Sequence, residues 1–472
     1  MNSKAINIIR NFSYALSSNL VSLIVSTIVI LIVPKLISVE EYGYWQLYLF
    51  YSSYIGFLHF GWNDGIYLRF GGAEYKNLDK RLFFSQFYMM VGLQLLISII
   101  MSITAILLFE DVDRRFIIWM IAICLLIVNV RQMLSLILQS TNRIKEYASV
   151  TMSGRIIYVL VIILLLVVGI RDYQLLIVSD LIGKLFSLSL AIYYCKDIVF
   201  RKVFSYYFSF REAVRNTKVG IKLMIANIAS TLIIGVVRFG IEHSWDIETF
   251  GKVSLTMSVS GLMIVFINAI GIVIFPILRR TDNAKLSQIY ITIRDFLMFI
   301  LLFFMIVYFP LKGFLLFWLP NYAESLMFMA LIFPMIVYEG KTVLLLNTYF
   351  KTLRKEKVML RINLFSLFIS ILTTLLTTIL VKDLNLAVLS IVFIIAFRCI
   401  LAEIILTSFL KINVYKDIIL ELVMSIIFIV LGWFMNIWVA VIGYLVAYVI
   451  YMLIKRKDIT NTIQYIKLLT KA

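Results

Sequence analysis

Nine charged side chains fall in or near the long apolar segments of this sequence. A charge near the centre of a lipid bilayer costs roughly 2.5–3.5 kcal/mol even on the mildest scale, so such residues normally face a bundle interior or a water-filled cavity. Arginine binds phosphate and carboxylate groups through two parallel hydrogen bonds. The arginines therefore indicate a binding site for an anionic ligand. The nine residues are Asp64, Arg131, Asp180, Lys184, Arg238, Glu339, Lys341, Arg398 and Glu403.

Helical spacing decides which of these charges can neutralise a neighbour on the same helix. Asp180 and Lys184 are four residues apart, so they share a helix face and can form a local ion pair. Such a structural pair is the alternative to a role in ligand binding. Glu339 and Lys341 are two residues apart, and their side chains diverge by about 200° around the helix. These two side chains cannot simply pair with each other.

The remaining charges have no obvious partner in the sequence. Arg398 and Glu403 are five residues apart and diverge around their helix, while Arg131 and Arg238 have no acidic neighbour on their own predicted helices. Arg238 lies a few residues from the end of its segment, so snorkelling to the membrane surface is an alternative to facing a cavity. The predicted substrate-binding cations are Arg131, Lys184, Arg238, Arg398 and Lys341.

Two apolar segments carry a stripe of polar side chains. Asn227, Thr231 and Arg238 fall within about 40° of one another on a helix. Asn19, Ser22 and Ser26 make an equivalent stripe on the first segment. Two such stripes indicate two walls of one cavity, and the alternative is hydrogen bonding between packed helices. The residues predicted to line the cavity or to couple transport to an ion are Asn19, Ser26, Asp64, Asp180, Asn227, Thr231 and Glu339.

The composition is that of a membrane protein that crosses the bilayer many times. Of 472 residues, 62% are hydrophobic and 15% are charged, with a mean hydropathy of +1.00. A soluble protein has about 25% charged residues. The three cysteines and two histidines lack the spacing of a zinc site or a disulfide framework, so no metal site is expected. The first apolar run, about 12–37, is too long for a signal-peptide core and is interpreted as a retained helix.

About fourteen apolar segments are long enough to cross a bilayer as helices, which predicts an all-α protein. The loops that alternate to one side, such as 351–361, are rich in Lys and Arg, whereas those on the other side, such as 109–115, are acidic or mixed. This asymmetry predicts that both termini are cytoplasmic, and the net charge of +18 then requires no nucleic acid. The predicted spans are 14–37, 42–64, 83–109, 116–138, 148–169, 174–195, 219–241, 250–277, 295–312, 323–346, 361–381, 386–409, 418–433 and 437–454.

A weak internal repeat relates the two halves of the chain. Asn19 and Asn227 each open an apolar helix, an acidic loop follows, and Gly43 and Gly251 then stand early in the next helix, at the same separation. Parallel repeats place a substrate path between the lobes. The predicted division is an N-terminal six-helix lobe over 1–210, a second six-helix lobe over 211–410, and two additional helices with a cytoplasmic tail over 411–472. Chance similarity of apolar helices is the alternative.

The first 80 residues resemble bacterial polysaccharide exporters of the O-antigen flippase (Wzx-type) family. The similar stretches are "NIIRNFSYALSSNL", the Glu-Tyr-Gly at 41–43 and "GWNDGIYLRFGG" at 61–72. This family belongs to the multidrug/oligosaccharidyl-lipid/polysaccharide exporter superfamily. The resemblance implies two six-helix bundles around a central cavity, alternating access, and a location in the bacterial inner membrane.

The implied substrate is an oligosaccharide repeat unit linked to undecaprenyl diphosphate, for O-antigen, capsule or other surface polysaccharide synthesis. The implied partners are membrane lipids, a polysaccharide polymerase and a chain-length regulator. No cofactor is expected, and coupling to H⁺ or Na⁺ is left open, with Asp64 or Asp180 as groups that could titrate. The two additional helices resemble those of lipid II flippases, but such flippases carry arginines on their first helix, and no arginine stands between Phe12 and Pro34.

Other functions predict different sequence features. A multidrug/toxin antiporter would share the fold but would have a cavity dominated by acidic and aromatic residues. A membrane-embedded polymerase would carry a large outer loop, whereas every outer loop here is short. A membrane glycosyltransferase would need catalytic acids, such as an Asp-Asp pair in a loop, and the sequence has none. The sequence therefore predicts a transporter rather than an enzyme.

Overall fold

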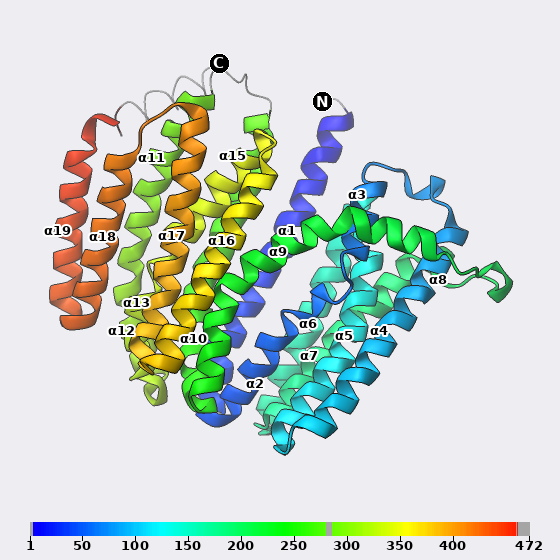
Figure 1. Cartoon of the computed structure of the whole chain (residues 1–472). Helices are drawn as coiled ribbons and strands as arrows, with labels where there is room; N and C mark the ends of the chain where they lie inside the picture. The colour runs from blue at the N-terminus through cyan, green and yellow to red at the C-terminus, as the bar shows by residue number, and fades with distance from the viewer. Residues whose placement is uncertain (1–2, 280–285, 459, 461–472) are drawn as a thin grey trace. The chain divides into compact units, whose positions relative to one another are not determined.

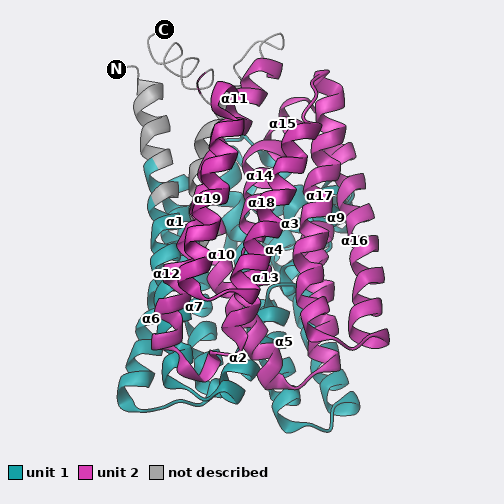
Figure 2. Ribbon diagram, turned by 90° about the vertical axis from the view of Figure 1, so that its left-hand side faces the viewer, with its two compact units in different colours: residues 1–228 teal, residues 229–472 magenta. Residues whose placement is uncertain are grey.

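The computed structural model describes residues 3–279, 286–458 and 460, and regular structure in this part of the chain is helical throughout. The chain divides into two compact units, 1–228 and 229–472, and the boundary falls inside one long helix, α9 (Phe210–Ser244) (Figure 2). This confirms the predicted all-α class. The finer division at residues 210 and 410 stays a prediction.

Unit 1 is built from long helices joined by short turns and one broken crossing (Figure 1). Besides the first part of α9, its helices are α1 (Ser3–Leu36), α2 (Val39–Ser52), η1 (Ile55–Phe57), α3 (Trp62–Phe70), η2 (Tyr75–Asn77), α4 (Lys80–Leu108), α5 (Val112–Ser140), α6 (Ile144–Val168), α7 (Tyr173–Tyr194), α8 (Lys196–Val199) and η3 (Val203–Ser205).

Unit 2 contains the rest of α9, several continuous helices, and crossings that are assembled from shorter helical pieces. These are α10 (Ile247–Arg279), α11 (Leu286–Phe304), η5 (Met305–Val307), α12 (Tyr308–Trp318), η6 (Pro320–Tyr322), η7 (Ser325–Met327), α13 (Phe328–Ile332), α14 (Met335–Lys341), the π-helical η8 (Thr342–Leu346), α15 (Asn347–Thr352), α16 (Glu356–Thr374), the π-helical η9 (Leu375–Leu380), α17 (Leu384–Leu410), α18 (Tyr415–Phe434) and α19 (Ile437–Ile454).

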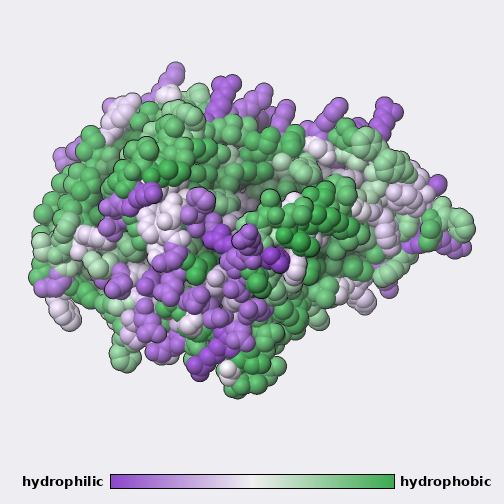
Figure 3. Space-filling view, turned by 60° about the horizontal axis from the view of Figure 1, so that its bottom comes forward, coloured by the Kyte–Doolittle hydropathy of each residue, from purple (hydrophilic) through white to green (hydrophobic). Residues whose placement is uncertain are grey.

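Twelve helical segments in the described residues are long and apolar enough to cross a membrane. They match twelve of the fourteen predicted spans. The two others correspond to the broken crossing formed by α2, η1 and α3, and to α10. In the space-filling view, a hydrophobic band covers the sides of the helices, and hydrophilic residues gather at their ends (Figure 3). That distribution is the one a bilayer requires.

The helix boundaries follow the repeat that the sequence indicates. Helix α1 ends at Leu36 and α9 ends at Ser244, which is 208 residues later, and α2 and α10 begin with the same offset. The first turns of α2 and α10 are each capped by a short polar side chain. Ser38 accepts a hydrogen bond from the backbone N–H of Glu41, and Asp246 accepts one from Thr249 at 2.7 Å. The bond from Thr249 lowers the pKa of the Asp246 carboxyl.

The broken crossing in unit 1 is stabilised by hydrogen bonds from side-chain amides. Between α2 and α3 the chain leaves helical geometry, and Gly61 has a positive φ of 78°. The Nδ2 of Asn129 donates to the carbonyl of Ile55 at 3.1 Å, and the Nε2 of Gln94 donates to the carbonyl of Leu58 at 3.2 Å. A backbone carbonyl released inside a membrane needs such a partner. These amides therefore make the break a stable part of the fold.

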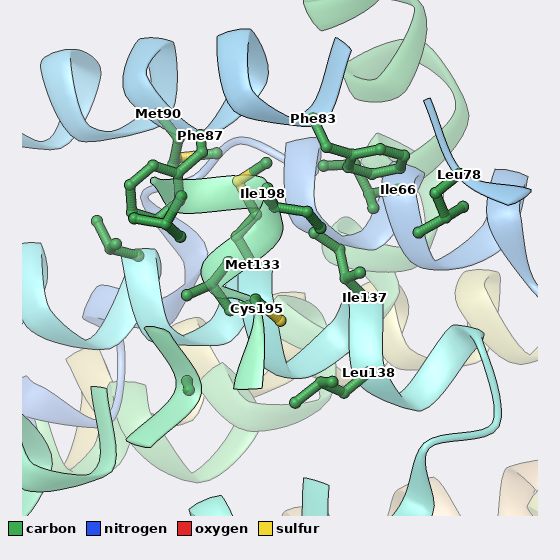
Figure 4. Close-up of a cluster of buried hydrophobic side chains, with 14 of the residues drawn as sticks. Ile66, Leu78, Phe83, Phe87, Met90, Met133, Ile137, Leu138, Cys195 and Ile198 are labelled. Atoms are coloured by element: carbon green, nitrogen blue, oxygen red, sulfur yellow. The ribbon is translucent and has the colours of Figure 1, made fainter. Parts of the chain in front are cut away.

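An apolar cluster in unit 1 packs α3, α4, α5 and α8 together near the broken crossing. Figure 4 shows Phe83 and Phe87 of α4, Met133 and Ile137 of α5, and Ile198 of α8 in this cluster. All five side chains are buried. The cluster also includes Val150 of α6 and Ala191 of α7, so it contacts three of the helices that line the polar cavity described next.

Candidate functional site

Unit 1 contains a polar cavity of about 320 Å³ between four of its helices. Helices α2, α5, α6 and α7 each contribute side chains. The lining residues are Leu49, Ser52, Ser53, Arg131, Thr151, Gly154, Arg155, Tyr158, Asp180 and Lys184. Three predicted residues, Arg131, Asp180 and Lys184, are thus brought together in one cavity.

Two glycines bring α6 and α7 close enough to form this wall. A Cβ on Gly183 would lie 2.6 Å from the carbonyl oxygen of Gly154 and 2.9 Å from the Cβ of Tyr158. A larger residue at Gly183 would therefore push the helices apart. Small residues at helix contacts in membranes allow this approach. Ser187, one turn further on α7, donates to the carbonyl of Val150 at 2.6 Å and closes the contact.

Arg131 is positioned by this same helix contact. Its Nη1 donates to Ser187 Oγ at 3.2 Å, and Ser187 in turn is fixed by its bond to α6. No carboxylate is bonded to Arg131 in the described residues. Its guanidinium therefore keeps donors and charge for a ligand in the cavity.

The predicted ion pair between Asp180 and Lys184 is confirmed. Lys184 Nζ donates to Asp180 Oδ2 and also lies 3.2 Å from the Sγ of Cys124. Tyr48 of α2 donates its hydroxyl to the same Asp180 oxygen at 2.7 Å. Oδ2 of Asp180 thus has two partners, and the charge of Asp180 offsets that of Lys184.

Arg155 belongs to the cavity although it is not among the predicted site residues. It lies on α6, inside the predicted span 148–169, so its position in an apolar segment was a sufficient signal. Its side chain is exposed. With Arg131, Arg155 and Lys184 against Asp180, the formal charge of the cavity lining is +2. The excess positive charge resides on the two arginines.

The other predicted residues of unit 1 do not line this cavity. Asp64 lies in the first turn of α3, with its Oδ2 3.9 Å from the Nε2 of His59. Asn19 and Ser26 are half-buried on α1, and Asn227 is exposed on α9. Their predicted roles in the cavity or in ion coupling stay predictions.

Arg238 lies in unit 2, in contact with the start of α10. Its Nη2 donates to Ser254 Oγ at 2.9 Å, and the guanidinium carbon lies 5.4 Å from the centre of the Phe250 ring. The interpretation that its helix has no acidic residue is wrong, because α9 extends to Ser244 and carries the buried Glu242 four residues further on. Thr231, one of the stripe residues, is exposed. A substrate-binding role for Arg238 stays a prediction.

Glu339 and Arg398, which have no partner on their own helices, pair with each other. Arg398 Nη2 donates to Glu339 Oε1 at 2.5 Å, and its Nη1 donates to Ser230 Oγ at 3.1 Å. The pair joins α14, α17 and α9 within unit 2. Sequence spacing could not reveal it, because the two residues are 59 positions apart.

Lys341 lies in a second buried ion cluster of unit 2. Its Nζ contacts Glu403 and lies 2.6 Å from Glu421 Oε2. Arg294 Nε lies 2.7 Å from Glu403 Oε1, and Arg294 Nη2 lies 2.5 Å from Glu421 Oε1. Arg294, Lys341, Glu403 and Glu421 are nearly inaccessible to solvent.

The ion cluster continues toward the ends of α18 and α19. Lys455 Nζ lies 3.0 Å from Asp295 Oδ1 and 2.9 Å from Asp417 Oδ1. Glu421 was not among the predicted site residues, although it stands inside the predicted span 418–433. Arg294, which stands one residue before the predicted span 295–312, was not among them either. A substrate-binding role for Lys341 stays a prediction.

Comparison with known proteins identifies related sequences and folds. A family model described as "Polysaccharide biosynthesis protein" matches residues 32–316. No curated protein sequence matches the chain. The structure of the lipid II flippase MurJ in an inward closed conformation is similar, with a TM-score of 0.64 at 13% identity, covering 94% of this chain and 99% of that chain.

Two MATE structures are also similar. An inward-facing multidrug resistance MATE family transporter of the MOP superfamily has a TM-score of 0.61 at 11% identity, covering 84% of this chain and 99% of that chain. A MATE structure in the straight conformation has a TM-score of 0.54 at 12% identity, covering 86% of this chain and 97% of that chain. Identities this low show the fold alone, which this chain shares with these transporter structures.

Proposed function

We propose that this protein is a flippase for a polyprenyl-diphosphate-linked oligosaccharide. The chain belongs to the polysaccharide biosynthesis protein family, which supports this proposal. In this proposal the repeat unit, linked to undecaprenyl diphosphate, crosses the bacterial inner membrane for O-antigen, capsule or other surface polysaccharide synthesis. The chain is a multi-pass membrane protein with the fold of membrane transporters. These observations support transport rather than catalysis.

The cationic cavity of unit 1 is the observation that carries the proposal. Its lining holds two arginines whose charge is not offset by Asp180. A diphosphate carries its negative charge on oxygens that guanidinium groups bind in pairs. Entry into a membrane protein removes water from these oxygens, and Arg131 and Arg155 would replace part of that hydration. The polyprenyl tail needs no site in the cavity because it is soluble in lipid.

Transport would proceed by alternating access. The substrate must bind the inward-open and outward-open states with similar strength, because a large preference would trap one of them. Arg131 suits this requirement, since a serine hydroxyl holds it and no tight ion pair must break first. Asp64 and Asp180 remain the groups proposed for coupling to H⁺ or Na⁺.

Two related functions are the alternatives. A lipid II flippase would share the fold, but the first helix has no arginine between Phe12 and Pro34. A multidrug antiporter would need an acidic cavity for cationic drugs, and the described cavity of unit 1 has a positive lining. The polysaccharide flippase therefore explains both the family and the charge.

The test is deletion of the gene in its host, followed by assays of surface polysaccharide and of lipid-linked oligosaccharide in membranes. We expect the polymer to be lost and complete lipid-linked units to accumulate. Wild type should restore export, while Arg131→Gln and Arg155→Gln should lower the export rate by about 10- to 100-fold, the worth of one charge-assisted hydrogen bond. Arg171→Gln, an exposed arginine in a loop of the same unit, is the matched control.

Each outcome separates the functions. Unchanged polysaccharide with increased sensitivity to drugs or dyes would replace the flippase by an antiporter. Loss of cell-wall precursor export, with surface polysaccharide intact, would indicate a lipid II flippase. If both arginine variants export at the rate of Arg171→Gln, the flippase can stand but this cavity does not bind its substrate.

A further inference from the structure

The first turns of α9 carry four cations on one face. Arg211, Arg215, Lys218 and Lys222 are spaced by four, three and four residues, which places them within about 60° around the helix and along roughly 17 Å of its length. All four side chains are exposed. Arg215 Nη1 lies 3.6 Å from Glu212 Oε1, but the other oxygen of Glu212 is bonded by Arg69 at 2.8 Å.

The opposite face of this part of α9 packs against the rest of unit 1. The buried residues on that face include Ala213, Asn216 and Gly220. A Cβ on Gly220 would overlap the carbonyl oxygen of Gly61, so the backbones of α9 and α3 are in direct contact. Helix α9 therefore cannot roll about its axis, and the four cations are held facing away from unit 1.

The segment that precedes α9 leaves large apolar side chains uncovered. Phe204 is 96% exposed, and Val203 is 81% exposed. Phe200 and Phe208 are each 71% exposed, and Phe208 stacks on Phe210 at 5.9 Å between ring centres. Isolated exposed apolar residues need no explanation, but a continuous group of this kind marks an interaction site.

This exposed segment is fixed to α4 rather than loose. Arg81 Nε donates to the carbonyl of Ser205 at 3.2 Å, and Ser85 Oγ accepts a bond from the backbone N–H of Tyr207 at 3.1 Å. Gln86 Nε2 donates to the carbonyl of Ser209 at 3.1 Å. The backbone is thus tied down by three successive bonds, while the exposed phenylalanine rings beside it can contact something else.

The start of the segment is fixed in the same way. Tyr75 donates its hydroxyl to Asp197 Oδ1 at 2.6 Å, and Lys80 Nζ lies 3.1 Å from Asp197 Oδ2. Burial raises the pKa of the Asp197 carboxyl, but these two hydrogen bonds outweigh it and hold the pKa below its usual value.

The charge distribution along α9 places this region at the membrane surface. The helix has 35 residues and is about 50 Å long, which exceeds the roughly 30 Å hydrocarbon core. No charged residue occurs from Leu223 to Val237, so the hydrocarbon-spanning part lies there. In Figure 1 the first half of α9 runs across the direction of α4 and α5, at the ends of these helices. Residues 196–222 therefore lie at the water–lipid interface.

We propose that residues 196–222, the α8–α9 surface, bind the phosphate headgroups of anionic membrane lipids. The segment contains seven lysines and arginines, two acidic residues and six aromatic residues. Aromatic side chains are favoured at the level of the headgroups, and clustered cations attract anionic lipids to their own surroundings. The aromatic rings anchor the surface in the leaflet, and the stripe on α9 binds the phosphates. This binding does not depend on what the cavity of unit 1 carries.

The test measures which lipids surround residue 204. The variant Phe204→Cys is labelled with bimane, which is selective because Cys124, Cys195 and Cys399 are buried. The labelled protein is placed in nanodiscs that contain brominated phosphatidylglycerol or brominated phosphatidylcholine, each as the only quenching lipid. We expect both lipids to quench the label, and phosphatidylglycerol to be enriched about fivefold, the effect of one cation at a membrane surface.

A charge-matched control separates this surface from general attraction. Neutralising Arg211, Arg215, Lys218 and Lys222 to glutamine should abolish the enrichment at residue 204. Neutralising Lys351, Arg354, Lys357 and Arg361, four exposed cations at the end of α15, in the turn that follows it and at the start of α16, should leave it unchanged. Melting temperatures verify that both variants fold.

Two results would overturn the proposal. Equal loss of enrichment in both variants would show general charge attraction with no dedicated surface. A label that neither lipid quenches, but that a water-soluble quencher reaches, would show that the rings project into water. The surface would then be a docking site for an acidic protein partner.

Discussion

Arg131 and Arg398 are both arginines on membrane-spanning helices, but their guanidinium groups have different partners. Arg398 donates to the carboxylate of Glu339, whereas Arg131 donates to the hydroxyl of Ser187. A carboxylate neutralises the charge that an anionic ligand would meet, and a hydroxyl orients the side chain without neutralising it. Of the two, Arg131 is the better phosphate-binding group.

Arg238 has a hydroxyl partner as well, and its role can be separated from packing. If Arg238 binds the substrate, Arg238→Ala should abolish export, while Ser254→Ala, which removes only the partner of its Nη2, should keep most of it. The measurement is surface polysaccharide restored in the deletion strain. Equal loss in both variants would assign Arg238 to the contact between α9 and α10. Full export by Arg238→Ala would also end its proposed role.

At the level of elements, the ion cluster of unit 2 connects α18 and α19 to the rest of the unit. Glu421 on α18 contacts Arg294 of α11 and Lys341 of α14, and Lys455 follows the end of α19. Each cation contacts at least two carboxylates, so the cluster depends on all of its members. Ion pairs as well as apolar packing therefore hold α18 and α19 against the rest of unit 2.

Removal of one cation from this cluster should be strongly destabilising. Lys341→Met leaves Glu403 and Glu421 to share Arg294, and a buried charge without its partner costs about 3–5 kcal/mol. We expect the apparent free energy of unfolding, measured by SDS titration of the purified protein, to fall by this amount. The double variant Lys341→Met/Glu421→Gln removes one charge of each sign and should be less destabilised. A double variant that is as unstable as the single one would contradict this account.

Sequence spacing revealed local relations between charges and missed distant ones. The pair of Asp180 and Lys184 follows from one helical turn. The pair of Glu339 and Arg398 depends on how α14 packs on α17, and no property of either helix alone predicts it. Arg155 and Glu421 differ again, because both stand inside predicted apolar segments and were visible in the sequence. Only the packing of helices required the structure.

For the whole molecule, the crossings were predictable because each one needs about twenty apolar residues. The segment 42–64 was predicted as one helix, and the structure shows α2, η1 and α3 in its place. The sequence there is long enough and apolar enough, but the break is stabilised by Asn129 and Gln94 from other helices. Hydropathy predicts that this segment crosses the membrane, but it does not predict that the helix is broken.

The predicted orientation has a direct test in intact cells. Single cysteines at Glu110 and Lys357, both exposed loop or helix-end positions, should lie on opposite sides of the membrane. A membrane-impermeant maleimide should label Glu110→Cys in intact cells and Lys357→Cys only after lysis. The native cysteines are buried and give a low background. The reverse pattern would invert the predicted topology, and labelling of both positions in intact cells would show that the number of crossings between them is wrong.

The hydrogen bonds that Asn129 and Gln94 donate to the broken crossing have a consequence for biogenesis. Asn129 leaves the ribosome 74 residues after Ile55, the residue whose carbonyl it binds. The carbonyl of Ile55 also accepts the backbone N–H of Leu58 at 3.0 Å, so until then it has one of its two bonds. The carbonyl of Leu58 gains its partner 36 residues later, when Gln94 of α4 is synthesised. The complete set of hydrogen bonds at the break can form only after both α4 and α5 are present. We therefore expect this crossing to reach its final form only after α4 and α5 have been synthesised, later than its place in the chain alone suggests.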